Sequence, residues 1–217
     1  MSNYILKYSR DERVKYISHL DFVRLFHRTI RRTDLNFIFS QGFNPHPVMT
    51  VAQPLSVGVT SDCEYMKVGF DGDYSEQDII NTINNAFPPG YKILAAKKVE
   101  GKEIDLTKLD RAEYTVELEY EGIADTEKLL DSSELKVMKK SKSGVKESDI
   151  RPYIYSIEKL SDKDGVLVLK MCIAIGSVYN LKPQSVIDAM EKYLDNFKAG
   201  FMNVHRNSMM CGENEPL

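Results

Sequence analysis

Three side chains near the N-terminus are of types that could carry acid–base chemistry. His19 and Asp21 stand two residues apart at the start of an expected helix, and His46 lies between two prolines in the run Ser40-Gln41-Gly42-Phe43-Asn44-Pro45-His46-Pro47. Histidine titrates near neutral pH, so a His/His/Asp set could cleave RNA by general acid–base catalysis or hold a metal ion. Residues two apart diverge by about 200° on a regular helix, so His19 and Asp21 cannot share one small ligand there.

These three candidates differ in how well packing accounts for them. We interpret His19 as a capping or packing residue and Asp21 as a first-turn carboxylate favoured by the helix dipole. His46 belongs to a stiff, irregular loop with polar groups, the kind of segment on which binding and catalytic residues often lie. His46 is therefore the candidate that packing explains least.

A stripe of arginines follows on the same expected helix. Arg24, Arg28 and Arg31 are spaced i, i+4 and i+7, so their guanidinium groups share one face, and Arg32 widens it. Guanidinium groups bind phosphates and carboxylates bidentately, which suits a nucleic-acid backbone or an acidic protein surface. The plainer interpretation is a solvated helix face that pairs with Asp21 or Asp34.

Polar loop residues add to the candidate binding site. We predict that the ligand is bound by the following residues: Arg24, Arg28, Arg31, Arg32, Gln41, Asn44 and His46. An amide such as that of Asn44 can order the loop or donate to the same ligand.

Other catalytic patterns are missing from the sequence. Ser18-His19-Leu20-Asp21 is not a serine-hydrolase triad, because triad members come from separate elements and no Gly-x-Ser-x-Gly motif occurs. No phosphate-binding Gly-x-x-x-x-Gly-Lys-Ser/Thr loop and no Gly-x-Gly-x-x-Gly motif occurs either. The three cysteines, Cys63, Cys172 and Cys211, are widely spaced and form no Cys-x-x-x-Cys-x-x-Cys cluster motif. We therefore expect no metal and no cofactor.

The elements that must position these residues follow from hydrophobic periodicity. In the first half the expected elements are a strand at 4–8, a helix at 19–32 with Val23, Phe26 and Ile30 buried, strands at 37–39 and 63–70, a helix opened by Ser75, and a strand at 91–99. The order β-α-β-β-α-β predicts a ferredoxin-like domain at 1–99.

The second half approximates the same order. The expected elements are strands at 112–120 and 135–139, a short helix at 125–130 between them, strands at 150–159 and 166–174 joined by a turn at 161–165, a helix from Lys182, and a strand at 201–206. The charged stretch 100–110 is the expected linker. The prediction is an α+β protein of two tandem ferredoxin-like domains, 1–99 and 111–217, the second divergent.

Composition and charge set the outer bounds. The chain has 217 residues, 42% of them hydrophobic, and a net charge of −3. Residues 1–50 carry eight Lys or Arg and four Asp or Glu, a net +4, so residues 51–217 carry −7. No apolar stretch approaches the ~20 residues of a membrane span, and the N-terminus lacks the apolar core of a signal peptide. We expect no membrane association and a cytoplasmic location.

Several motifs together resemble one bacterial family. They are Tyr16 to Asp21, the four arginines, Phe39 to Pro47, Pro54-Leu55, Val57-Gly58-Val59 and Glu64-Tyr65. The sequence resembles the bacterial radical S-adenosylmethionine-linked family, densely over residues 4–100 and more thinly through Asp149 to Tyr153. It departs at Leu35-Asn36, where that family often has Leu or Ile followed by Pro. The domain occurs alone or fused behind a radical S-adenosylmethionine protein and has no assigned function, so the resemblance implies such a protein as partner.

Two functional classes remain. The first is a non-enzymatic accessory module that binds RNA, or an RNA-bearing assembly, for the radical S-adenosylmethionine partner; an acidic peptide is an alternative ligand. The second is a metal-independent RNA endonuclease or RNA-modifying enzyme that uses His19 and His46, by fold analogy with the endonucleases of bacterial immunity and with pseudouridine synthases. The glycine-rich loop typical of those endonucleases is missing at Ala199-Gly200-Phe201. We favour the module.

Overall fold

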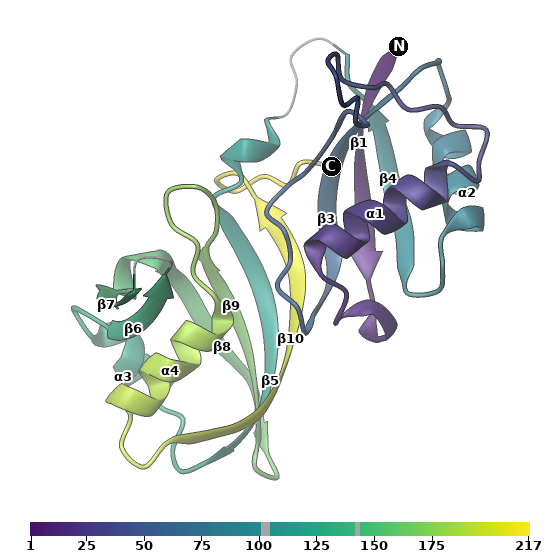
Figure 1. Ribbon diagram of the computed structural model, residues 1–217. Coiled ribbons are helices and arrows are strands. Elements are labelled where there is room, and N and C mark those ends of the chain that lie inside the picture. Colours follow the sequence, from purple (N-terminus) through teal and green to yellow (C-terminus); the bar gives the residue numbers. More distant parts are fainter. Residues whose placement is uncertain (101–104, 142–143) are drawn as a thin grey trace. The chain divides into compact units, whose positions relative to one another are not determined.

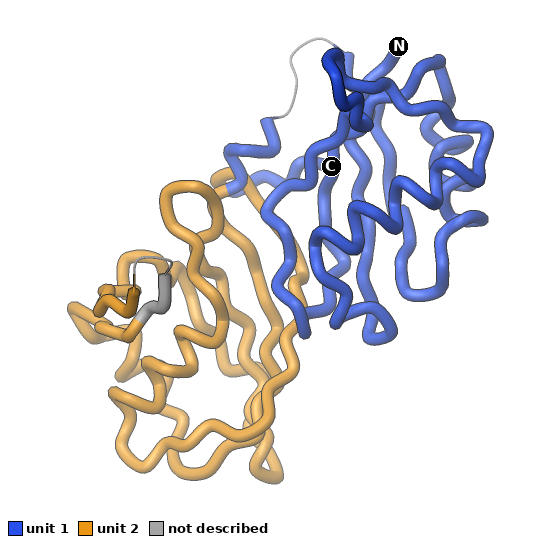
Figure 2. The backbone as a smooth tube through the Cα atoms, in the orientation of Figure 1, with its two compact units in different colours: residues 1–109, 213–217 blue, residues 110–212 orange. Residues whose placement is uncertain are grey.

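The computed structural model describes residues 1–100, 105–141 and 144–217, and the side chains of 139–141 lie outside that description. Within these ranges the chain forms two compact units, residues 1–109 with 213–217 and residues 110–212 (Figure 2). Residues 101–104 of the expected linker lie outside the described residues.

Among its described residues the first unit contains four strands and two α-helices, with short 3-10 helices at Glu12–Val14 and Leu106–Lys108 (Figure 1). They are β1 (Ser2–Arg10), α1 (His19–Ile30), β2 (Met49–Val51), β3 (Val59–Phe70), α2 (Glu76–Ala86) and β4 (Tyr91–Lys98). All pairings are antiparallel: β4 with β1, β1 with β3, and β3 with β2. The strands thus lie in the order fourth, first, third, second, and the predicted pairing of the first strand with that at 63–70 is confirmed.

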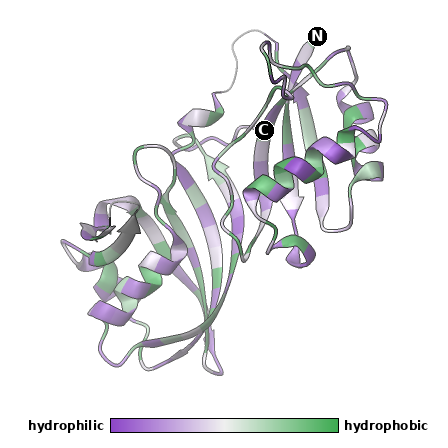
Figure 3. Ribbon diagram, in the orientation of Figure 1, coloured by the Kyte–Doolittle hydropathy of each residue, from purple (hydrophilic) through white to green (hydrophobic). Residues whose placement is uncertain are grey.

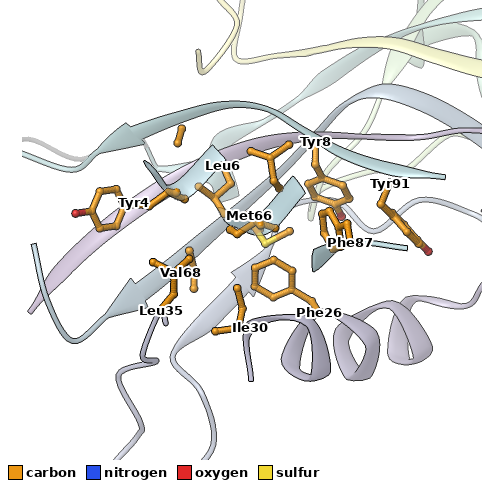
Figure 4. Packing of buried hydrophobic residues seen from close by; sticks show 14 of the residues in the cluster. Tyr4, Leu6, Tyr8, Phe26, Ile30, Leu35, Met66, Val68, Phe87 and Tyr91 are labelled. Carbon is orange, nitrogen blue, oxygen red and sulfur yellow. The ribbon is translucent and has the colours of Figure 1, made fainter. Parts of the chain in front are cut away.

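The core of the first unit lies between one face of this sheet and the two helices. Figure 4 shows side chains of the sheet packed beside Phe26 and Ile30 of α1. Alternate residues of β1, among them Tyr4, Leu6 and Tyr8, point to this face, as the period of two requires. From α1, Phe22 and Phe26 are buried and their rings contact each other at a centroid distance of 6.3 Å. Phe26 and Ile30 are buried as expected, but Val23 is only half-buried and Phe22 takes its place in the buried stripe.

The strand expected at 37–39 is not formed. Phe37 and Phe39 make only isolated bridges, to Phe70 and Pro47, and β2 lies further along the chain. Phe37 is buried, and its ring packs on those of Phe26 and Phe70. The loop 40–47 therefore lies in the crossover between α1 and β2 and not after the second strand.

The second unit contains a four-stranded antiparallel sheet and a separate hairpin. Its elements are β5 (Arg111–Glu121), α3 (Thr126–Asp131), β6 (Lys136–Ser141), β7 (Gly144–Asp149), β8 (Ile154–Lys163), β9 (Val166–Ala174), α4 (Pro183–Tyr193) and β10 (Lys198–Met210). The main sheet has the order β10-β5-β9-β8. The expected strand at 135–139 corresponds to β6, but it pairs with β7 outside the main sheet, and that hairpin was not predicted.

The α+β class is confirmed by this architecture. If the β6–β7 hairpin is set aside, the second main sheet also pairs its strands in the order fourth, first, third, second. In the described part of the chain no helix is long and apolar enough to cross a membrane.

Candidate functional site

Helix α1 begins at a well-formed cap. The Ser18 hydroxyl accepts a hydrogen bond from the Asp21 backbone N–H at 3.2 Å and donates to the Asp21 carboxylate at 2.7 Å. Such a cap satisfies one of the free N–H groups at a helix start, and a carboxylate there is favoured by the dipole. The Ser18 hydroxyl, and then Arg24, holds the pKa of Asp21 below its usual range. Asp21 is thus engaged in starting the helix.

The arginines of α1 occupy the side of the helix that faces solvent. At about 100° per residue, Arg24, Arg28 and Arg31 lie within roughly 60° of one another and opposite the buried Phe22 and Phe26. Arg24 pairs with Asp21, its Nη1 lying 3.0 Å from the carboxylate. Within the described residues, the guanidinium groups of Arg28 and Arg31 have neither a hydrogen bond nor an ion pair, and both residues are exposed.

Arg32 is placed differently from the other three arginines. Its guanidinium donates to the carbonyl of Arg28 at 3.1 Å and to the carbonyl of Ala86 at 2.7 Å. A third, longer contact of 3.4 Å reaches the Thr29 hydroxyl. Ala86 is the last residue of α2, so Arg32 ties the C-terminal ends of the two helices together.

His27 lies within the candidate site, and the sequence interpretation did not include it. Its Nε2 lies 3.1 Å from the Met49 sulfur, and its ring meets that of Phe37 edge-on at a centroid distance of 5.6 Å. Burial lowers the pKa of His27, and the positive charges of Arg31 and His46 lower it further. His27 follows Arg24 by three residues and precedes Arg31 by four, so it lies beside the arginine stripe on the helix surface. This spacing is the sequence signal that could have identified it.

The loop 40–47 is closed at its base by its own polar groups. The Ser40 N–H donates to the His46 carbonyl at 2.8 Å, and the His46 N–H donates to the Ser40 hydroxyl at 3.1 Å. That hydroxyl also lies 2.8 Å from Nδ1 of the His46 ring. The other ring nitrogen, Nε2, has no hydrogen bond within the described residues, and the residue is exposed.

The tip of the loop exposes the other predicted contact residues. Gln41 and Asn44 are exposed, and Phe43 is as accessible as in a free chain. Gly42 has φ +129°, a conformation that L side chains rarely adopt. Because Met49 and Phe37 both contact His27, the base of this loop adjoins the C-terminal half of α1.

The structure does not bring His19 and His46 together. His19 opens α1 and is half-buried, and burial followed by the charge of Arg10 lowers its pKa. His46 belongs to the loop tied to α1 at His27, eight residues or about 12 Å further along the helix. The described residues contain no group of three or more His, Cys, Asp or Glu arranged to hold a metal ion. A shared two-histidine centre is therefore not formed.

Solved structures similar to this chain share little sequence with it. A chain of the crystal structure of a Cbf5-Nop10-Gar1 complex has a TM-score of 0.54 at 8% identity, covering 95% of this chain and 48% of that one. A chain of an archaeal box H/ACA sRNP Nop10-Cbf5 complex gives 0.47 at 7% identity, covering 94% and 46%. An unknown protein from Galdieria sulphuraria gives 0.28 at 11% identity, covering 94% and 98%. This chain spans about half the length of the first two.

The first of these likenesses concerns the fold alone, at an identity too low to carry function. No curated protein matches the sequence. A family profile does match, over residues 3–183, which is most of the chain. The protein belongs to the family described as an uncharacterized protein conserved in bacteria, DUF2344.

Proposed function

We propose that this protein is a non-enzymatic recognition module that binds RNA through the solvent face of α1 and the adjoining loop 40–47. The observation that carries the proposal is the pair Arg28 and Arg31. Both are exposed and have no partner within the described residues. The neighbouring charged side chains do have partners, because Asp21 pairs with Arg24 and the Arg32 guanidinium donates to the Ala86 carbonyl. Cations without internal partners remain available for an external anion.

The charge around this pair favours a polyanion. Arg24 lies one turn before Arg28, and His46 lies close enough for its charge to lower the pKa of His27. A phosphate backbone releases counterions when it meets such a cluster, which gives affinity without sequence preference. The amides of Gln41 and Asn44 and the outer nitrogen of His46 supply donors and acceptors for base edges or the 2′-hydroxyl. These are the groups that an unspecific cationic surface lacks.

The finer architecture and the partner belong to the same proposal. Both main sheets pair their strands in the order fourth, first, third, second, which supports ferredoxin-like domains at 1–99 and 111–217 with the linker at 100–110. The resemblance of the motifs to the radical S-adenosylmethionine-linked family supports a radical S-adenosylmethionine protein as partner, in the cytoplasm. An RNA-binding module would present the substrate and leave the reaction to that partner.

The test is the double variant Arg28→Ala/Arg31→Ala, assayed by filter binding with total cellular RNA and a labelled 20-nucleotide oligouridine across a salt series. Loss of two phosphate contacts should weaken binding and make the slope of log affinity against log salt shallower by about 1.4 units. The matched control is Lys92→Ala/Lys97→Ala, which removes the same charge from two exposed residues of β4. Equal slopes in the wild type and the arginine variant would refute the proposal.

The same samples discriminate the module from an enzyme. Intact RNA after long incubation, with and without divalent metal, is the expected result. Shortened RNA in the wild type that is intact in His46→Ala would instead indicate an endonuclease, because loss of an acid–base histidine lowers turnover by about two to four orders of magnitude.

A further inference from the structure

Phe43 has a position that folding does not explain. Its side chain is as exposed as in an extended chain, 106% on the relative scale, while Phe22, Phe26 and Phe70 are at most 1% exposed. A fully hydrated phenyl ring gains no burial free energy in the folded protein. Single exposed apolar residues are common on protein surfaces, so the exposure of Phe43 gains meaning from the closed loop that carries it and from the cations that adjoin that loop.

The loop holds the backbone of Phe43 in a defined place. Three interactions between Ser40 and His46 close the base, and Pro45 fixes its backbone φ. A ring presented on a closed loop loses little conformational entropy when a ligand covers it. The arrangement is therefore preorganised for a flat apolar partner.

The surroundings of the ring indicate what that partner is. The loop base contacts α1 at His27, through Met49 and Phe37, and Arg31 follows one turn later. An apolar protein partner would have to cover the unpaired cations of Arg28 and Arg31 at the cost of their hydration. A nucleotide brings a flat apolar base and a phosphate together, so one chain segment satisfies both features.

We infer that Phe43 is a stacking platform for an unpaired base, so that the ligand class of this site is single-stranded RNA and not duplex RNA. This inference rests on the proposed function. In an A-form duplex the base faces are covered by their neighbours and only edges and the backbone are exposed. A single strand or an open loop offers a base face to Phe43 while its phosphates reach the arginines.

The experiment uses the full chain, a 12-nucleotide oligoadenylate, and a duplex of the same oligoadenylate with oligouridine. The chain contains no tryptophan, so Phe43→Trp introduces a single fluorescent reporter at the loop tip. We expect oligoadenylate to quench this tryptophan and to bind Phe43→Trp at least as tightly as the wild type. Phe43→Ala should weaken oligoadenylate binding roughly tenfold or more, while the salt slope stays unchanged. The duplex should bind more weakly and be indifferent to Phe43→Ala.

The outcomes separate this inference from the proposed function. If oligoadenylate and duplex bind the wild type equally and Phe43→Ala changes neither, the arginines bind RNA and the stacking inference is wrong. If the wild type binds neither RNA at low salt, both statements fail together. Phe43 makes no packing contact that its loss would remove, so an unchanged melting temperature of Phe43→Ala serves as the folding control.

Discussion

Replacement of Arg32 by alanine separates an arginine that supports the fold from those that we propose to bind the ligand. The guanidinium of Arg32 donates to the carbonyls of Arg28 and Ala86, and these carbonyls belong to the last turns of α1 and α2. Carbonyls at a helix end have no partner within the helix, so a cation there also interacts favourably with the dipole. Arg32→Ala removes both effects at once.

The magnitude follows from these contacts. The two bonds of 3.1 and 2.7 Å are well formed, whereas the 3.4 Å contact to Thr29 is too long to add much. A charge-assisted hydrogen bond at a partly solvated site contributes about 0.5–1 kcal/mol after discounting for water. We therefore expect Arg32→Ala to lower the free energy of unfolding of the first unit by about 1–2 kcal/mol.

The assay is urea unfolding followed by circular dichroism, together with oligouridine binding on the same protein. With m of about 2 kcal/mol/M, the midpoint should fall by roughly 0.5–1 M. Arg31→Ala is the matched control, since it removes the same charge from the neighbouring position and has no described partner to lose. Its midpoint should stay within experimental error while its RNA affinity falls. An Arg32→Ala protein of wild-type stability that no longer binds RNA would refute this assignment of roles.

Two further predictions concern the core and the response to pH. Phe26→Ala should lower the free energy of unfolding by about 3–5 kcal/mol, as measured by chemical denaturation, because its ring is fully buried against those of Phe22, Phe37 and Phe87. A loss below about 1 kcal/mol would mean that neighbouring side chains fill the space left by the ring. His19 and His27 have pKa values lowered from 6.5, mainly by burial, so the unfolded chain binds more protons than the folded one just below that pH. Stability should therefore fall as the pH drops from about 7 toward 5, and His19→Gln/His27→Gln should flatten this part of the profile. A wild-type urea midpoint that is constant over this range would contradict the burial of the two rings.

Local signals in the sequence predicted most of the framework. The Ser18 cap and the i, i+4, i+7 arginines are readable because the residues that form each pattern lie within two helical turns of one another. The phase of the buried stripe was harder to fix, since Phe22 and Val23 are adjacent and both apolar, and only the packed sheet decides between them. The hairpin β6–β7 was missed because it pairs away from the main sheet.

The parts of the site that could not be predicted depend on distant partners. Met49 lies 22 residues from His27, and Ala86 lies 54 residues from Arg32. The periodicity of the sequence does not encode such contacts, because they depend on how the crossover to β2 and helix α2 pack in the folded unit. For that reason Arg32 was grouped from the sequence with the other three arginines, without its carbonyl partners, and His27 was not considered at all.

The order of strands in the second unit has a consequence for how the chain folds during synthesis. β5 pairs with β10, so that Val116 meets Val204 across 88 residues of chain. The sheet of the first unit, by contrast, has all its strands once Lys98 has been made. Until β10 leaves the ribosome, β5 has an open edge on that side, and such edges invite association with other chains. The strands of the second unit therefore cannot all pair until β10 has been made, and this pairing is slow because long-range contacts are entropically costly.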